Sequence, residues 1–277
     1  MIASFRSEWF RLRRRPAVWL LAAALLAILL LFTYLLVWAV LTNPPRGLVV
    51  AGGTPAALKR ILYPADWPHT VLGDTTGLGG AIAMIIGVLV AGSEYGWGTV
   101  KTILTQGPGR LRILAGKAAA MELLIAVLAA AMLGVGAAAS AILVTADGRT
   151  STWPSAGLVL EAFGAAWLIL SMYAGLGFAL GLLFRQTGVA LGVGLVYALV
   201  VEGLVLNLLG GADAFKPIVS AFPGANASGL VRWFPSTGPR AAVQPLMGAG
   251  QASIVLAAYI VLFAVVSALV FRARDVD

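Results

Sequence analysis

The sequence predicts an all-α integral membrane protein whose 277 residues form a single transmembrane domain, 1–277. Hydrophobic residues make up 60% of the chain and charged residues 11%, whereas a typical soluble domain contains about 45–50% and about 25%. A soluble protein of this length has no interior large enough for so much apolar surface. Six apolar stretches are also long enough to cross a bilayer, which takes about 20 residues.

The six spans differ in how clearly the sequence defines them. They are predicted at residues 17–41, 71–92, 118–144, 157–184, 187–209 and 252–271. The first and last are the clearest, and the second is the weakest because its apolar part is short. The first run is also longer than the apolar part of a signal peptide, about 7–15 residues. We therefore interpret it as a retained span.

Basic residues are divided unevenly between the two sides of the membrane. With the N-terminus inside, the cytoplasmic side carries 12 lysines and arginines and the other side carries 7. This bias predicts that both termini are cytoplasmic. The net charge of +8 lies at the ends of apolar runs, so membrane lipids rather than nucleic acid are the expected partners. The bias toward Ala, Gly, Val, Leu and Arg suits a bacterium, which predicts the bacterial inner (cell) membrane.

Residues 1–16 are predicted to form an amphipathic helix in front of the first span. Apolar residues recur at helical spacing, and arginines occupy the remaining face. These residues are Ile2, Phe5, Trp9, Leu12, Arg13, Arg14 and Arg15. Such a helix suits the cytoplasmic headgroup layer. The alternative is a basic tail that only fixes the orientation of the first span.

Two outer loops contain signals for further helices. Thr54 is a helix N-cap residue followed by proline at the first helical position, which predicts a short helix over residues 56–62. The last outer loop, 210–250, is rich in proline and glycine but also contains an apolar cluster that includes Trp233 and Phe234. Broken, re-entrant helices that dip into the outer leaflet explain this cluster, since irregular backbone is tolerated there when protein or water shields it.

The sequence lacks the residues that several kinds of chemistry require. It has one histidine, His69, and no cysteine, so no transition-metal or haem site is expected. The phosphate-binding loop Gly-x-x-x-x-Gly-Lys-Ser/Thr and the Gly-x-Ser-x-Gly nucleophile motif are both absent. We therefore expect no catalytic residue, no metal and no cofactor in this chain.

Residues 93–112, between the second and third spans, form the most informative segment. Four apolar residues lie on one helical face, polar residues lie on the other, and a Gly-Pro-Gly stop follows. The apolar residues are Trp97, Val100, Ile103 and Leu104, and the polar ones are Thr99, Lys101, Thr102, Thr105 and Gln106. A helix of two turns is too short to be stable alone in water, so we expect it to dock against a partner. An ordinary basic loop, the alternative, explains neither the amphipathic helix nor its stop.

This segment resembles that of the type-2 permeases of ABC transporters, which are found mainly in bacterial exporters. Their pattern is an acidic residue, a Gly-Thr pair, a short helix, and then a Gly/Ser-rich turn with arginine. The matching residues are Glu94, Gly98, Thr99, Gly107 and Arg110, with Lys117 opening the next span. The likeness extends to the whole layout: an elbow helix, six spans and re-entrant helices in the last outer loop. Gly96 departs from the pattern, which has a larger, often basic, residue there.

The resemblance implies the membrane subunit of an ATP-driven exporter. The segment 93–112 would then be a cytoplasmic coupling helix, with Trp97, Lys101 and Leu104 in the groove of a separate ATPase subunit. Two such chains, identical or related, would enclose the path, and two ATPase subunits with ATP and Mg would drive transport. Glu94 lies close to the level of the elbow arginines, so we expect it to pair with Arg13, Arg14 or Arg15.

Three acidic residues inside the predicted spans are candidates for a functional role, because charge within the membrane is costly. Glu122 and Glu161 lie close to the interfaces and can reach them. Glu202, with Asn207 further out, is the deepest, about 10 Å from the end of its span at about 1.5 Å per residue. It is either a structural group bonded to a neighbouring helix or part of the substrate path. In a proton-coupled secondary transporter or channel, the alternative to the exporter, Glu202 would carry protons.

Glycine pairs spaced by four residues occur in the fourth and fifth spans. They are Gly177/Gly181 and Gly188/Gly192. Small residues at this spacing let helix backbones approach closely. The pairs therefore predict helix packing and carry no information on function.

Overall fold

The computed structural model describes residues 2–44, 54–96, 109–209, 215–238 and 247–273. These residues form helices joined by short connections, without a strand among them, so the all-α prediction is confirmed. The predicted single domain and its boundaries remain an interpretation of the sequence.

Among the described residues, six helices are long and apolar enough to cross a membrane, which makes the chain a multi-pass membrane protein. They cover Pro16–Thr42, Trp67–Gly92, Leu111–Ala146, Ala156–Phe184, Thr187–Val205 and Ala249–Ala273. Their number and order agree with the sequence prediction. The second helix begins before the predicted residue 71 and the third before 118. Both differences arise because the predicted spans contain only the apolar run, whereas the helices also include the residues that precede it.

Three of the six crossings found in the described residues combine several helical segments. The first consists of α2 (Pro16–Ile28), a π-helical stretch and α3 (Val37–Thr42), and the second of α5 (Trp67–Asp74), a π-helical stretch and α6 (Gly80–Gly96). The third is α8 (Arg110–Ala146) and the fourth α9 (Ala156–Phe184). The fifth comprises α10 (Thr187–Leu195), the π-helical stretch Val196–Val201 and α11 (Glu202–Leu209), and the sixth is α14 (Ala249–Ala273).

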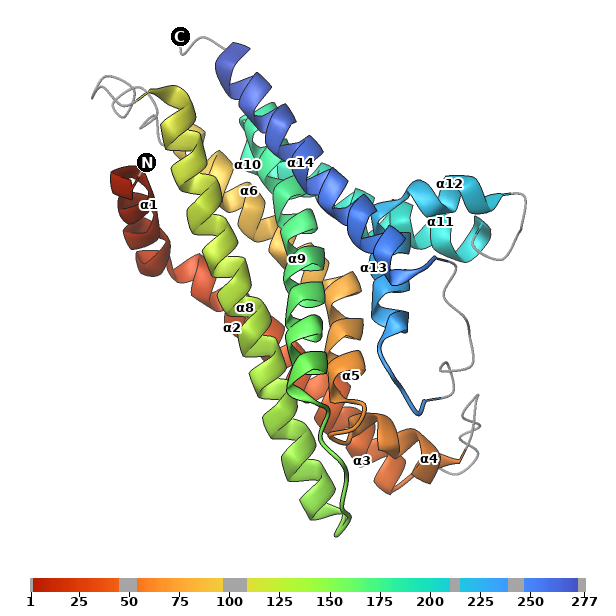
Figure 1. Ribbon diagram of the computed structural model, residues 1–277. Helices are drawn as coiled ribbons and strands as arrows, with labels where there is room; N and C mark the ends of the chain where they lie inside the picture. The colour runs from red at the N-terminus through yellow and green to blue at the C-terminus, as the bar shows by residue number, and fades with distance from the viewer. Residues whose placement is uncertain (1, 45–53, 97–108, 210–214, 239–246, 274–277) are drawn as a thin grey trace.

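The core of the bundle lies between α6 and α9. In Figure 1, α9 lies between α8 and α14, and both chain ends lie at the upper end of the bundle. In the 18-residue apolar stretch of each crossing, 72% of the second and 61% of the fourth are buried, compared with 17%, 17% and 11% of the first, fifth and sixth. The first, fifth and sixth crossings therefore present most of their apolar side chains outward.

Glycines allow α6 and α9 to touch along their backbones. A Cβ atom built at Gly87 would lie 2.0 Å from the Ala174 carbonyl oxygen, and one at Gly177 would lie 2.0 Å from the Met84 carbonyl oxygen. The prediction of close packing is thus confirmed for Gly177, and Gly181 also lies against α6. It is wrong for the second glycine pair as far as the described residues go, because a Cβ atom there would meet nothing within 4 Å.

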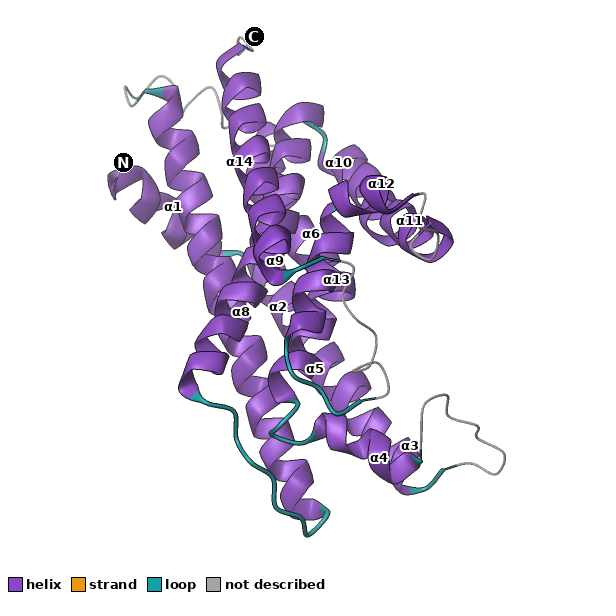
Figure 2. Cartoon of the chain, turned by 45° about the vertical axis from the view of Figure 1, so that its right-hand side comes forward, coloured by secondary structure: helices purple, strands orange, loops and turns teal. Residues whose placement is uncertain are grey.

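The N-terminal helix α1 (Ile2–Arg14) lies against α8 (Figure 2). Leu12 is buried, while Phe5 and Trp9 are partly buried against the core. At Gly116 of α8, a Cβ atom would lie 2.7 Å from Cβ of Ser4. The predicted amphipathic helix is therefore present, and part of its apolar face is covered by protein rather than by lipid.

At the opposite end of the bundle, the short helix predicted after Thr54 is present. The Thr54 hydroxyl accepts a hydrogen bond from the Ala57 amide at 3.3 Å, as expected for an N-cap residue. Helix α4 (Pro55–Lys59) continues into a 3-10 turn, Arg60–Leu62. The turn replaces the second half of the α-helix expected there.

Candidate functional site

Most of the predicted ATPase-coupling residues lie outside the described part of the chain. These are Trp97, Gly98, Thr99, Lys101, Leu104 and Gly107, and the side chains of Glu94 and Arg110 lie outside it too. The described ends of α6 and α8 reach the same end of the bundle as α1 and the last turn of α14 (Figure 1). The predicted pairing of Glu94 with an elbow arginine stays a prediction.

The elbow arginines have different surroundings. Arg15 donates a hydrogen bond to the carbonyl oxygen of Leu89 in α6 at 3.0 Å, which ties the start of α2 to the second crossing. Arg13 is exposed, and its carbonyl oxygen accepts a bond from the Trp19 indole at 2.8 Å. The guanidinium of Arg14 lies 4.2 Å from the centre of the exposed Phe10 ring.

An acidic residue of α1 that sequence reasoning missed joins it to α8. Glu8 is 5% exposed and forms ion pairs with Arg11 at 3.3 Å and with Lys117 at 3.7 Å. A buried pair that loses one partner leaves an uncompensated charge. The signal in the sequence was that Glu8 is the one acid among the arginines of residues 1–16.

The deepest predicted acid, Glu202, forms the centre of the candidate site. It is 3% exposed and follows the π-helical stretch Val196–Val201 directly. Tyr173 of α9 donates its hydroxyl to Oε2 at 2.5 Å, and the Gly224 amide donates to Oε1 at 3.1 Å. The Tyr197 hydroxyl is a further hydrogen-bond partner. The carboxyl group therefore links the fourth and fifth crossings to the segment that follows them, whereas the side chain of Asn207 lies outside the description.

The Gly224 amide belongs to the first turn of α13 (Pro223–Trp233). Amides of a first turn have no partner within their own helix, and a carboxylate there also interacts favourably with the helix dipole. A Cβ atom at Gly224 would lie 2.4 Å from Oε2 of Glu202. Glycine is therefore needed for this close approach.

Helix α12 (Lys216–Ala221) and α13 occupy part of the predicted last outer loop. The Asn226 amide group donates to the carbonyl oxygens of Ser220 at 2.7 Å and Phe222 at 2.8 Å, which fixes the turn between the two helices. Helix α13 packs against α14, α5 and α9. Within the predicted apolar cluster, Phe234 is buried and Trp233 is 60% exposed.

The other acids of the crossings do not all behave as the sequence suggested. Glu161 is exposed near the start of α9, in keeping with an acid that can reach the interface. Glu122 instead contacts the neighbouring α9, where it accepts hydrogen bonds from Trp167 at 3.2 Å and Ser171 at 2.5 Å. Asp74, a fourth acid near the start of the second span, was overlooked and accepts a bond from Thr33 at 2.8 Å.

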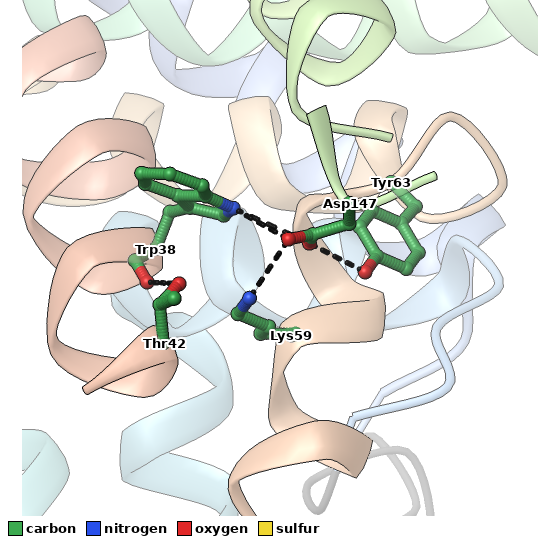
Figure 3. Close-up of polar contacts among 5 residues, drawn as sticks. All are labelled: Trp38, Thr42, Lys59, Tyr63 and Asp147. Carbon is green, nitrogen blue, oxygen red and sulfur yellow. Dashed lines mark hydrogen bonds and ion pairs between the residues drawn. The ribbon is translucent and has the colours of Figure 1, made fainter. Parts of the chain in front are cut away.

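A polar cluster surrounds Asp147 (Figure 3), at the end of the bundle where α3 and α4 lie (Figure 1). The carboxylate follows α8 and accepts hydrogen bonds from Lys59 at 2.9 Å, Tyr63 at 2.7 Å and the Trp38 indole at 3.2 Å. It thereby joins α3, α4 and the end of α8. Burial and the bond to Asp147 raise the pKa of Tyr63 from 10.0 to about 12. Burial acts to raise the pKa of Asp147, but its hydrogen bonds and the Lys59 charge outweigh burial and lower this pKa below 3.8.

These shifts predict how stability depends on pH. Ionised Asp147 stabilises the folded protein at pH values above about 4, and this contribution is lost as the pH falls further. Neutral Tyr63 stabilises it below pH 10, and this contribution is lost as the pH rises from 10 to about 12.

We expect Asp147→Asn to lower stability by about 1–3 kcal/mol at neutral pH, with the difference from wild type shrinking below about pH 4. Thermal unfolding in detergent measures this, and equal melting temperatures at pH 7 would contradict it.

The described residues contain no group of three or more His, Asp or Glu side chains placed to hold a metal ion. A search of curated proteins gave no match. One protein family, DUF2705, described as protein of unknown function, matches residues 80–276. The match runs from the start of α6 beyond the end of α14, so it includes Glu202, α13 and the core between α6 and α9. Because it covers more than half of the sequence, the chain belongs to the DUF2705 family.

Proposed function

We propose that the chain is the permease subunit of an ABC-type exporter in the bacterial inner membrane, with both termini in the cytoplasm. Two permease chains, identical or related, form the substrate path, and two separate ATPase subunits supply ATP and Mg. The observation that supports the proposal is the position of the described helix ends on either side of the predicted coupling segment. The ends of α6 and α8, which flank this segment, lie at the end of the bundle where α1 and the last turn of α14 lie (Figure 1).

The packing of the flanking helices supports a role in transmitting motion. Helix α6 lies against the backbone of α9 through Gly87 and Gly177. Helix α8 is joined to α1 through the ion pair between Glu8 and Lys117. Because close-packed interiors transmit displacement, a partner that pushes on the segment between α6 and α8 would move α9 and α1 together with them.

The fifth crossing supports pairing with a second permease. Only 17% of it is buried, and Val189, Val193, Val196 and Val200 are exposed along it. A Cβ atom added at Gly188 or Gly192 would also meet nothing within 4 Å among the described residues beyond their own helix. Small residues beside an apolar stripe allow a helix of another chain to approach closely.

The proposal is tested by purification in mild detergent and by one substitution. We expect a nucleotide-binding protein to co-purify, and Leu104→Asp to reduce the associated ATPase activity at least tenfold, because a carboxylate in an apolar contact is strongly unfavourable. Thr105→Asp is the matched control on the predicted polar face and should retain the partner. Full retention of the ATPase by Leu104→Asp would show that the coupling-helix interpretation is wrong.

The buried Glu202 favours one rival, a proton-coupled transporter or channel without an ATPase. In an ATP-driven exporter, protonation of Glu202 is not an obligatory step, and Glu202→Gln should preserve ATP-dependent transport. The rival is tested in pyranine-loaded proteoliposomes with an imposed pH gradient and no ATP. If wild type dissipates the gradient and Glu202→Gln does not, the exporter proposal is wrong and the proton-coupled protein is the better account.

A further inference from the structure

A groove with a volume of about 390 Å³ lies between α8 and α14, with α9 as its floor. In Figure 1, these are the yellow-green and dark blue helices on either side of the green α9. The lining residues are Leu111, Leu114, Ala115, Ala118, Met121, Glu122, Gly175, Phe178, Ile260, Phe263, Ala264, Ser267 and Ala268. The groove is therefore almost entirely apolar, with a carboxyl group and a hydroxyl group as its polar side chains.

Only one oxygen of the Glu122 carboxyl group accepts hydrogen bonds from the described residues. Both of its hydrogen bonds, from Trp167 and Ser171 of α9, end on Oε2. The described residues supply no hydrogen bond to Oε1. No basic residue is among the described residues that line the groove, and Lys117, five positions earlier on α8, is directed to Glu8. The groove therefore has a negative or hydrogen-bond-accepting group that the protein does not neutralise.

The second polar group is Ser267 of α14. It is 2% exposed, and its Oγ has no hydrogen-bond partner among the described residues. A buried hydroxyl without a partner is unfavourable, and such groups in native proteins commonly indicate a missing ligand or solvent molecule. Ser267 and Glu122 lie on opposite walls of the same groove. A ligand that donates a hydrogen bond would satisfy the free oxygen of Glu122, and Ser267 offers a second polar contact at another level of the groove.

We propose that this groove binds a single-chain amphipathic amine, with its ammonium group at Glu122 and its apolar chain along α8 and α14. A cationic donor matches an unneutralised carboxylate through a charge-assisted hydrogen bond. The volume lies at the small end of the range for ligand sites, about 300–1,000 Å³, which suits one alkyl chain rather than a two-chain phospholipid. The site does not depend on an ATPase partner, so it stands or falls separately from the exporter proposal.

The test uses purified full-length protein in phosphatidylcholine nanodiscs and a decylamine that carries a diazirine in its chain. After irradiation, we expect saturable labelling of peptides from α8 and α14 that unlabelled decylamine suppresses. Glu122→Gln should raise the half-saturating concentration about tenfold or more, the loss expected for one charge-assisted hydrogen bond. A decyl alcohol with the same diazirine should label weakly and equally in both proteins.

Two further variants separate this site from general membrane partitioning. Ala264→Phe places a ring in the groove from an exposed position of α14, so it should abolish the labelling while the fold is retained. Glu161→Gln removes an exposed acid outside the groove and should leave labelling unchanged. Unsaturable labelling, or equal half-saturation in wild type and Glu122→Gln, would overturn the proposal. Displacement of the probe by phosphatidylethanolamine in the nanodisc would also overturn it, because the groove would then be a lipid site.

Discussion

Gly177→Ala is expected to destabilise the bundle by about 3 kcal/mol, the upper end of the cost of overpacking. The added methyl group would lie 2.0 Å from the Met84 carbonyl oxygen, so α6 and α9 would have to separate. The clash is with backbone, which cannot rotate away as a side chain can. Thermal unfolding by tryptophan fluorescence and size-exclusion chromatography in detergent measure the effect.

Gly164→Ala provides the control on the same helix. A Cβ atom at Gly164 would meet nothing within 4 Å, and alanine in a helix interior is favoured over glycine by about 0.5–1 kcal/mol. This variant should therefore be as stable as wild type or slightly more stable. If both substitutions have the same effect, the backbone contact between α6 and α9 is not what limits the stability of the bundle.

Glu202→Ala is expected to cost about 3–5 kcal/mol and to release α13. The substitution leaves the Tyr173 hydroxyl and the Gly224 amide without their acceptor, at about 1–3 kcal/mol for each buried group. Thermal unfolding measures the total loss. Limited proteolysis around α12 and α13 then shows whether this segment opens before the rest of the chain.

The matched variants use the same contacts. Glu202→Gln keeps an acceptor oxygen and should recover most of the lost stability, while Tyr173→Phe removes one hydrogen bond and should cost about 1 kcal/mol. Gly224→Ala should cost less than Glu202→Ala, because its Cβ atom would displace the Glu202 carboxyl group without removing it. Equal stability of Glu202→Ala and Glu202→Gln would contradict the role assigned to the carboxyl group.

The sequence contained enough information for the helices but little for their contacts. The depth of Glu202 follows from counting residues along one apolar run, and the structure confirms that it is buried and bonded to a neighbouring helix. Its partner Gly224 could not be predicted, because the contact depends on how the chain turns before α13. The two glycine pairs illustrate the same limit: they have identical spacing, yet only Gly177/Gly181 faces another helix of the chain.

The periodicity of apolar residues also does not tell whether lipid or protein covers the apolar face of a helix. The pattern of α1 predicted an amphipathic helix, which is present, but the pattern is the same for a helix on lipid and for one on α8. The Asp147 cluster had no signal at all, because Lys59, Tyr63 and Trp38 come from three separate places in the sequence. Glu8, the acid that joins α1 to α8, is evident in the sequence, but its partner on α8 lies about a hundred positions away.

The separation between Glu8 and Lys117 has a consequence for biosynthesis. Because the chain is made from its N-terminus, α1 and the first two crossings leave the ribosome well before α8 exists. During this interval, Leu12, Phe5 and Trp9 lack the surface that later covers them, and the amphipathic pattern lets the nascent helix rest on the membrane. We therefore expect α1 to dock on α8 only after insertion of the third crossing supplies Lys117 and Gly116. The headgroup position predicted from periodicity and the docked position in the folded chain would then be successive stages of one assembly.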